Sequence, residues 1–290
     1  MRPRTYRLKL IPLNPKLMST DNQKKSILSY RDPQTIAAMM PKFAWFYQYY
    51  FQVQTEGWHH IPPQDPILFV GSHNGGLASP DLPMFMYDWF RRFGYDRPIY
   101  GLMHRKVWQI HPIVAGLAEQ MGALPAEPWS ALTALQFGAS VLVYPGGAQD
   151  VFRPYHDRHR IQLAGRKGFI KLALRQSVPI IPIVSKGAHE TFLVVTDCYE
   201  QARQLHDWGV LPWYLDVDPE VMPLYLGLPW GIALGPLPHW PLPIPMKTKV
   251  CAPIHFDRSG RSAAQDLAYV DRCYDRVVQE MQQALDELYS

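Results

Sequence analysis

Short apolar runs alternate with helix-length segments along the middle of the chain, and this alternation constrains the fold more than any other feature. The clearest run is 67–70, between Pro66 and Gly71, which is typical of a buried parallel strand. Similar runs predict further strands at 53–56, 98–103, 140–144, 178–185 and 247–254. Strands that alternate with helices form βαβ units. The sequence therefore predicts an α/β protein with a mainly parallel central sheet flanked by helices.

The helices expected between these strands are marked by apolar spacing and by the glycines that end them. They are predicted at 82–92, 107–121, 129–137 and 166–176. A long amphipathic helix is predicted near the carboxyl terminus, where apolar residues recur three or four positions apart: Leu267, Val270, Tyr274, Val277, Met281, Ala284 and Leu288. The stretch 208–245 is rich in Pro, Trp and Gly and has no steady period. We expect it to be a long irregular lid or binding segment.

Composition narrows the class of protein. The chain has 290 residues, 47% hydrophobic and 19% charged, which suits a globular domain with a well-buried core. The formal net charge of +4 is too small to indicate a nucleic-acid partner, but it favours an anionic membrane surface or a phosphate-bearing ligand. The three cysteines lack metal-ligand spacing, and no apolar run is long enough to span a bilayer. We expect a cytoplasmic protein without a metal site.

The chain is predicted to begin with a basic arm, 1–40, followed by a single domain, 41–290. Seven of the first 25 residues are Lys or Arg, against one acid, Asp21. Such an arm is either simply solvated or bound to anionic lipid headgroups. The run 43–51 then contains seven aromatic residues, which pack in the core or settle at the depth of lipid headgroups. Both alternatives are open.

A glycine loop follows the central strand and contains the first candidate catalytic residues. His73 and Asn74 come directly after the strand, the adjacent Gly75 and Gly76 let the chain fold back, and Asp81 stands at the start of the next helix. Ligands of open α/β sheets bind beyond the carboxyl ends of strands. If the loop folds back, Asp81 can accept the Nδ1 proton of His73 and leave Nε2 free as a base. The alternatives are an N-cap role for the acid and a structural role for the histidine.

A second glycine loop, 144–148, follows another predicted strand. Its two adjacent glycines permit backbone amides to converge on an anion or a developing oxyanion. Because both loops follow strands of one sheet, a base and an oxyanion site are expected side by side. The chain lacks the glycine motifs of dinucleotide and nucleotide sites and the nucleophile elbow of hydrolases.

These segments together resemble the glycerolipid acyltransferase superfamily. The order of a strand, His73 and Asp81, a basic strand end, and the Tyr-Pro-Gly-Gly loop is similar to that superfamily. The stretches 144–152 and 166–174 are similar to its monoacylglycerol and diacylglycerol acyltransferase-like branch, which includes the phytyl-ester synthase type. The resemblance covers residues 50–257 or so and implies a single acyltransferase domain.

The resemblance implies an O-acyltransferase in which His73 is the general base and Asp81 its partner. The donor is acyl-CoA or an acyl carrier protein, acting as a co-substrate, and no resident cofactor, metal ion or covalent intermediate is expected. The protein is expected to meet its lipid acceptor as a peripheral membrane protein. The candidate substrate-binding residues are Asn74, Gly75, Gly76, Arg105, Tyr144, Pro145, Gly146, Gly147, Arg166 and Lys167. Arg105, Lys106, Arg166 and Lys167 are candidates for the donor phosphates, with plain solvation as the alternative.

One departure from the superfamily concerns the acceptor. Members that make phosphatidate carry an arginine for the acceptor phosphate where this chain has Gln149. Loss of that cation implies a neutral alcohol acceptor, although Arg153 lies only four residues further on. The rival hypotheses are a lysophospholipid acyltransferase and a lipid-binding protein that kept the fold without the chemistry.

Overall fold

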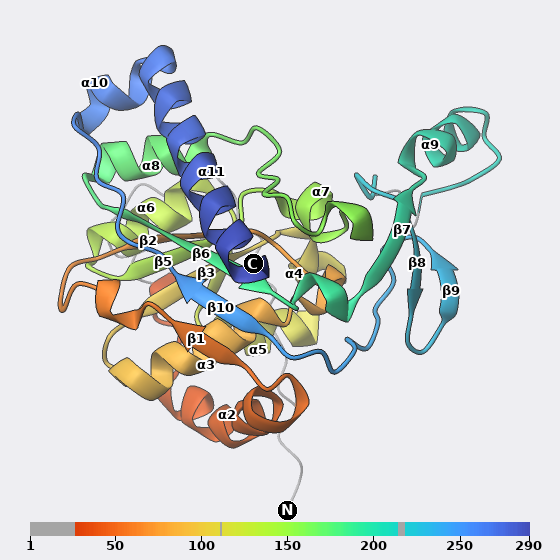
Figure 1. Ribbon diagram of the computed structural model, residues 1–290, viewed down its shortest axis with the longest axis horizontal. Helices are drawn as coiled ribbons and strands as arrows, with labels where there is room; N and C mark the ends of the chain where they lie inside the picture. Colours follow the sequence, from red (N-terminus) through yellow and green to blue (C-terminus); the bar gives the residue numbers. More distant parts are fainter. Residues whose placement is uncertain (1–26, 111, 214–217) are drawn as a thin grey trace, which may run out of the picture.

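The computed structural model describes residues 27–110, 112–213 and 218–290, and its centre is a seven-stranded sheet with helices on both faces (Figure 1). The strand order is β1-β10-β6-β2-β5-β3-β4. The five strands from β6 to β4 are parallel, whereas β10 runs antiparallel to β6 and pairs in parallel with β1. The strands are β1 (Gln54–Glu56), β2 (Leu68–Gly71), β3 (Ile99–Met103), β4 (Ala123–Pro125), β5 (Ser140–Val143), β6 (Ile180–Lys186) and β10 (Lys247–Val250). The predicted α/β fold with a mainly parallel sheet is confirmed.

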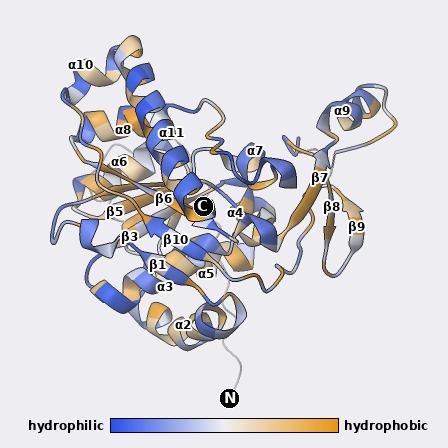
Figure 2. Ribbon diagram, viewed as in Figure 1, coloured by the Kyte–Doolittle hydropathy of each residue, from blue (hydrophilic) through white to orange (hydrophobic). Residues whose placement is uncertain are grey.

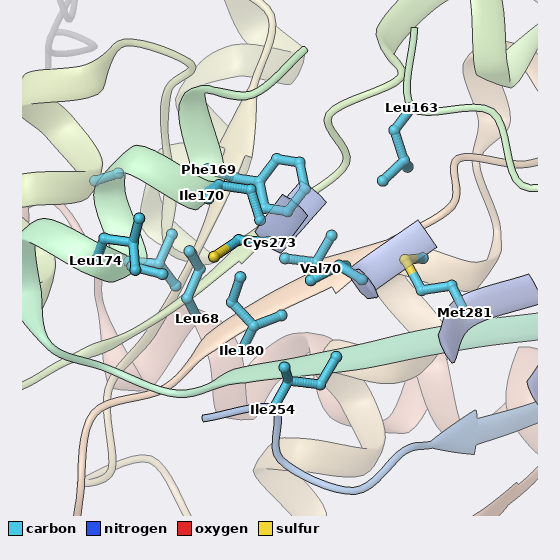
Figure 3. Packing of buried hydrophobic residues seen from close by; sticks show 14 of the residues in the cluster. Leu68, Val70, Leu163, Phe169, Ile170, Leu174, Ile180, Ile254, Cys273 and Met281 are labelled. Atoms are coloured by element: carbon cyan, nitrogen blue, oxygen red, sulfur yellow. The ribbon is translucent and has the colours of Figure 1, made fainter. Parts of the chain in front are cut away.

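Alternate residues of the central strand supply two separate hydrophobic cores. Leu68 and Val70 face the core beneath α6, α8, α10 and α11, part of which is shown in Figure 3. Ile67 and Phe69 face the opposite core, beneath α2 and α3. Because both faces are covered, the strand is apolar throughout rather than alternating, as is usual for parallel sheets. The helices are α2 (Pro33–Trp45), α3 (Asp81–Phe93), α4 (Lys106–Ile110), α5 (Pro112–Gln120), α6 (Pro128–Gln136), α7 (Gly147–Val151), α8 (Gly168–Gln176), α9 (Tyr199–Asp207), α10 (Gly260–Gln265) and α11 (Leu267–Tyr289).

The predicted helices at 107–121 and 267–288 are both found. In the first segment, α4 and α5 are helical on either side of residue 111, which lies outside the described residues. The amphipathic helix α11 buries Val270, Val277 and Met281 as predicted, whereas its first residue, Leu267, is exposed.

The stretch 208–245, of which 214–217 lie outside the described residues, is irregular only in part, so the prediction of a wholly irregular segment is wrong. It contributes β8 (Pro223–Gly227) and β9 (Gly231–Leu234) to a three-stranded antiparallel sheet with β7 (Leu193–Asp197). This small sheet projects from the side of the main body together with α9 (Figure 1). The many prolines of the stretch obscure the strand pattern of a short hairpin, whose two strands, β8 and β9, pair through their main chains.

The boundary expected between the arm and the domain at residue 40 falls inside α2. This helix is capped by Asp32, whose carboxylate accepts the N–H groups of Gln34 and Thr35. Its Ile36 is fully buried against α3, so the helix belongs to the folded domain. Residues 1–26, which contain the basic residues counted for the predicted arm, lie outside the described part.

The aromatic run 43–51 serves mainly as core. Tyr47 and Phe51 are buried with Met84 and Tyr87, which supports the packing alternative. Trp45 and Tyr49 of the same run are exposed, however. Within the described ranges, no helix is both long and apolar enough to cross a bilayer.

Candidate active site

The two glycine loops meet at the carboxyl ends of β2 and β5, which are adjacent parallel strands. His73 follows β2 and Tyr144 follows β5, and their rings stack with centroids 4.7 Å apart and planes inclined by 27°. The absence of a side chain at Gly71 makes room for the tyrosine, because a Cβ there would lie 2.3 Å from its ring. The structure therefore brings together the two loops that the sequence placed at one edge of the sheet.

A buried ion pair holds the backbone on both sides of His73. One Asp150 oxygen accepts the His73 N–H at 2.5 Å, and the other accepts from Arg153 Nη1 at 2.8 Å. Arg153 in turn donates to the His73 carbonyl at 2.8 Å and to Asn74 Oδ1 at 2.6 Å. The side chains of the pair are 0% and 2% exposed. We call this set the buried polar cluster: Ser72, Asn74, Asp81, Asp150 and Arg153.

Asp81 belongs to this cluster but does not bond to His73, contrary to prediction. Its carboxylate accepts from Asn74 Nδ2 at 3.0 Å and from the Leu82 N–H at 3.0 Å. Among the described residues, the Nδ1 atom of His73 is buried and has no hydrogen-bond partner. The N-cap alternative also fails, because Pro80 holds the cap position and the Ser79 hydroxyl donates to the Gly76 carbonyl instead. Asp81 therefore contacts the His73 loop through the side chain of Asn74.

Burial sets the protonation of the site. Desolvation, with a smaller contribution from the Arg153 cation, lowers the pKa of His73 to about 4, so the imidazole is neutral at physiological pH. Desolvation raises the pKa of Asp81 to about 7, against the hydrogen bond from Asn74. Burial also raises the pKa of Asp150, which the Arg153 cation opposes. A neutral imidazole is the form that can accept a proton.

The first glycine loop is packed too closely for side chains. Gly75 and Gly76 have φ angles of 74° and 61°, a left-handed conformation that glycine adopts without strain. A Cβ at Gly76 would lie 2.4 Å from His239 Cε1, and one at Gly75 would lie 2.7 Å from Thr191 Oγ1. His239 Nε2 is also 3.1 Å from the Gly75 carbonyl oxygen. The loop is thus fixed by the segment that follows the small sheet.

The second glycine loop leads into α7 and is equally crowded. Gly147 has φ of 58°, and a Cβ there would lie 2.2 Å from Arg166 Nη1. A Cβ at Gly146 would lie 2.3 Å from Asp150 Cβ. The Arg166 Nη1 atom lies 3.4 Å from the Pro145 carbonyl oxygen, to which it donates. Close packing against Asp150 and the Gln162 carbonyl therefore requires glycine at 146, whereas at 147 the positive φ favours it.

The predicted phosphate-binding cations divide into two groups. Lys106 and Arg166 meet at the carboxylate of Glu220, with N–O distances of 3.5 and 3.6 Å, and His104 joins them at 3.9 Å. We call Lys106 and Arg166 the cation group; desolvation lowers the pKa of the adjoining His104 and so disfavours its charged form. Arg105 and Lys167 lie elsewhere, where they pair with Glu127 at 2.9 Å and Asp271 at 2.8 Å. The structure thus brings together two of the four predicted phosphate-binding cations, Lys106 and Arg166.

A polar cavity of about 410 Å³ lies beside α7. Gln149 lines it, and so do four acids: Asp157, Asp197, Glu200 and Glu220. The cation on its wall is Arg153, whose guanidinium is already bonded to Asp150, Asn74 and the His73 carbonyl. In the described part of the chain, no group of three or more His, Cys, Asp or Glu side chains is arranged to hold a metal ion.

Sequence reasoning missed Asp150, Glu220 and His239 as members of the site; it considered Arg153 only as a cation for an acceptor phosphate and His104 only as part of a basic strand end. The available signal was the spacing of three residues between an acid and a base directly after the second glycine loop. On a helical turn this spacing places the two side chains on one face. No local pattern marks Glu220 or His239, which reach the site through the fold of the small sheet.

Comparison with known proteins assigns the class. A family model described as acyltransferase matches residues 52–186, which include the first glycine loop, and one described as diacylglycerol acyltransferase matches residues 126–289. The match to the second model spans more than half of the chain, and the chain belongs to the diacylglycerol acyltransferase family. The predicted membership of the glycerolipid acyltransferase superfamily is confirmed, and the protein is an O-acyltransferase.

Individual relatives agree with this assignment. An uncharacterized protein of Mycobacterium tuberculosis is 28% identical over 89% of this chain and 67% of its own length. The mouse diacylglycerol O-acyltransferase 2-like protein 6 is 26% identical over 51% of this chain and 45% of its length. The human 2-acylglycerol O-acyltransferase 3 is 24% identical over 50% of this chain and 41% of its length. The chain thus spans less than half of these two mammalian enzymes.

A solved structure shares the fold. The 1-acyl-sn-glycerophosphate acyltransferase of Thermotoga maritima superposes with a TM-score of 0.51 at 14% identity. The match covers 95% of this chain and 85% of that one. At this identity the likeness shows the common fold alone.

Proposed function

We propose that the chain transfers a fatty acyl group from acyl-CoA, or from an acyl carrier protein, to the hydroxyl of a neutral lipid alcohol. Candidate acceptors are a monoacylglycerol, a diacylglycerol or a long-chain alcohol. The observation that carries this proposal is the neutral imidazole of His73, held where two glycine loops meet in a chain of this family. His73 is partly exposed although its Nδ1 is buried, which leaves Nε2 as the atom that can meet a substrate.

The proposed reaction is a direct transfer with His73 as general base. Its Nε2 takes the proton of the acceptor hydroxyl while the hydroxyl oxygen attacks the thioester carbonyl carbon. The carbon–sulfur bond then breaks, and the departing thiolate takes the proton from the imidazolium. The products are the ester and the free thiol. Because burial makes the imidazolium costly, prompt return of the proton favours turnover.

The second glycine loop is the proposed oxyanion site. Asp150 connects it to the base, since this carboxylate accepts the His73 N–H and also packs against Gly146. Backbone N–H groups at Gly146 and Gly147 are the donors we assign to the negative charge of the tetrahedral intermediate. Such donors stabilise charge strongly where water is excluded.

Asp81 is proposed as a positioning residue that acts through Asn74. The amide of Asn74 donates to Asp81 and to the Ser72 carbonyl, and its oxygen accepts from Arg153. These bonds fix the peptide groups on both sides of the histidine. A fixed backbone aims the imidazole, and small misplacements of a catalytic base are costly in rate.

The electrostatics of the cavity at Gln149 support a neutral acceptor. A lysophosphatidate headgroup carries a dianionic phosphate, which requires cations when it is desolvated. Four carboxylates line this cavity, and three of them, Asp157, Glu200 and Glu220, are paired with Lys or Arg side chains. Arg153, which sequence reasoning considered as a substitute cation, is occupied by the buried polar cluster. Acids near a phosphate repel it. A hydroxyl without a phosphate faces no such penalty.

The cation group is the proposed contact for the phosphates of the donor. Lys106 follows β3, and Arg166 packs against the second glycine loop, so the group adjoins the proposed oxyanion site. Glu220 now neutralises part of its charge. A phosphate that displaces this carboxylate would gain charge-assisted hydrogen bonds.

Product analysis by mass spectrometry tests the proposal. The purified chain is offered acyl-CoA with a panel of neutral alcohols, and a neutral ester is expected. His73→Ala should lower the rate by about 100- to 10,000-fold, the usual contribution of a general base. His255→Ala, at an exposed histidine, is the matched control and should retain the parental rate. Binding of lipid without any ester product would instead support a non-catalytic lipid-binding protein.

A further inference from the structure

The small antiparallel sheet has two faces of opposite character. On one face, Val194 and Tyr225 pack with Phe152, Phe192 and Val221 in a core of their own. On the other face, cross-strand register aligns Leu193 with Leu226 and Ile232, and Leu224 with Leu234. We call this second face the apolar sheet face. It is built as regularly as the buried one.

Most of the apolar sheet face is exposed in the described chain, and only Leu193 and Leu224 are partly buried. Ile232 is 79% exposed, Leu234 is 50% exposed and Leu226 is 48% exposed. Figure 2 shows hydrophobic colouring along β7 and β8 where they project from the body. Contiguous exposed apolar patches of this kind mark interaction sites rather than ordinary surface.

Tryptophans extend the face toward the aromatic run. Trp230 lies at the hairpin turn, and Leu228 forms a bridge with Trp240. Both tryptophans are 53% exposed. The Trp240 indole N–H donates to the Tyr50 hydroxyl at 2.8 Å, and the centroid of the Tyr50 ring lies 5.7 Å from that of the exposed Trp45. Exposed aromatic side chains from two separate parts of the sequence therefore meet at Tyr50.

The absence of charged residues from the stretch around β8 and β9 indicates what kind of partner binds the apolar sheet face. The 26 residues 221–246 contain no Asp, Glu, Lys or Arg. Interfaces between proteins carry a polar rim with about one hydrogen bond per 100–200 Å². A lipid leaflet, in contrast, excludes charge and accepts aliphatic side chains, with Trp and Tyr at the depth of the headgroups. We propose that the apolar sheet face docks on a lipid bilayer and places its aliphatic side chains in the outer part of one leaflet.

The backbone limits how deep the sheet can go. β9 is an edge strand, so one row of its N–H and C=O groups is unpaired within the sheet. Unpaired backbone groups are excluded from the hydrocarbon interior because each costs several kcal/mol there. The sheet therefore lies at the interface and does not span the bilayer.

The docking face leads directly to the catalytic loop. His239, between the hairpin and Trp240, stacks on Phe192 with centroids 3.8 Å apart and contacts the first glycine loop through the Gly75 carbonyl. Leu77, in that loop, is 51% exposed. Insofar as the acceptor is a lipid dissolved in the bilayer, this inference rests on the proposed function. Docking would bring that acceptor to the His73 loop without passage through water.

Vesicle flotation with the full chain tests the inference. Phosphatidylcholine vesicles at high salt are the probe, because they carry no net charge and exclude binding through basic residues. The double variant Leu226→Asp, Ile232→Asp should bind at least about ten-fold more weakly, since two charges must then enter the interface. Leu267→Asp, at an exposed leucine near α10, is the matched control and should bind as the parent does. Equal binding of the double variant and the parent overturns the inference.

Two further measurements separate this inference from its rivals and from the proposed function. Brominated lipids should quench the tryptophan emission of the parent. They should quench the double variant Trp230→Phe, Trp240→Phe less, and equal quenching of both overturns the inference.

Oligomeric state separates docking on lipid from docking on a second copy. If the parent is a dimer that the aspartate variant turns into a monomer with unchanged vesicle binding, the face joins two copies and the inference fails. Transfer of a short acyl group to a short-chain alcohol in solution should survive in the aspartate variant. If the parent docks through this face but catalyses no transfer, the docking inference stands and the proposed function fails.

Discussion

The buried polar cluster around His73 holds charged side chains in the interior of the protein, whereas the apolar sheet face exposes aliphatic side chains to water. Asp150 and Arg153 are almost completely buried, while Ile232 is 79% exposed. Each arrangement costs free energy in an isolated chain. Hydrogen bonds within the cluster offset part of that free energy, whereas the aliphatic side chains of the sheet face form no hydrogen bonds and would be stabilised only by a binding partner such as a bilayer. The first region is therefore built to hold a loop and the second to meet a partner.

Removal of Arg153 should have the largest effect on stability. Arg153→Ala leaves the Asp150 carboxylate buried without its cation, which costs about 3–5 kcal/mol in comparable pairs. Urea unfolding measures this change in the free energy of unfolding. Arg160→Ala, which breaks an exposed pair with Asp157, should cost under about 1 kcal/mol. Similar losses in both variants would show that the cluster does not hold the site.

The same measurement on the sheet face should give almost no change. Ile232→Asp alters a side chain that is 79% exposed, and surface substitutions usually change stability by no more than about 0.5 kcal/mol. A loss approaching that of Arg153→Ala would mean that the face is packed against something within the chain. The contrast between the two regions would then disappear.

Asp81 should give the cluster a characteristic pH dependence. Its pKa is raised to about 7 by burial, from an ordinary value of 3.8, so the folded state binds more protons than the unfolded state between these values. This contribution to stability is fully present below pH 3.8 and is lost as pH rises through about 7. Asp81→Asn removes this titration. The parent should therefore lose at least about 1 kcal/mol relative to the variant between pH 4 and 7.

Comparison of the two proteins at each pH cancels the opposite contribution of His73, whose lowered pKa favours the folded state as pH rises toward 6.5. Parallel pH profiles for the parent and Asp81→Asn would contradict the assignment of the raised pKa to Asp81.

Glu220 lies between the two regions and should give the smallest effect. Glu220→Gln removes the carboxylate that now neutralises the cation group, so the KM for acyl-CoA should fall a few-fold while kcat changes little. The effect is small because partly exposed ion pairs are worth about 0–1 kcal/mol. Asp271→Asn, which frees Lys167 instead, is the control and should leave KM unchanged. A raised KM in Glu220→Gln would remove the cation group from the donor site.

The parallel sheet and the meeting of the two glycine loops could be predicted because both follow from local pattern. Apolar runs define the strands, and parallel strands bring their carboxyl ends to one edge. The hydrogen-bond partner of Asp81 could not be predicted. Asn74, and not His73, donates to its carboxylate, and this pairing depends on the three-dimensional path of the loop. The small sheet was missed because Pro223 begins β8 and Pro229 separates Leu226 from Ile232, and proline within an apolar run counts against a strand.

Competition between two acceptors tests the central claim most directly. The chain is given one acyl-CoA with equal concentrations of diacylglycerol and 1-acylglycerol-3-phosphate, presented in the same vesicles, and both products are quantified by mass spectrometry. Because four acids line the cavity at Gln149 and Arg153 is already bonded, triacylglycerol should dominate. Dominance of phosphatidate would contradict the account.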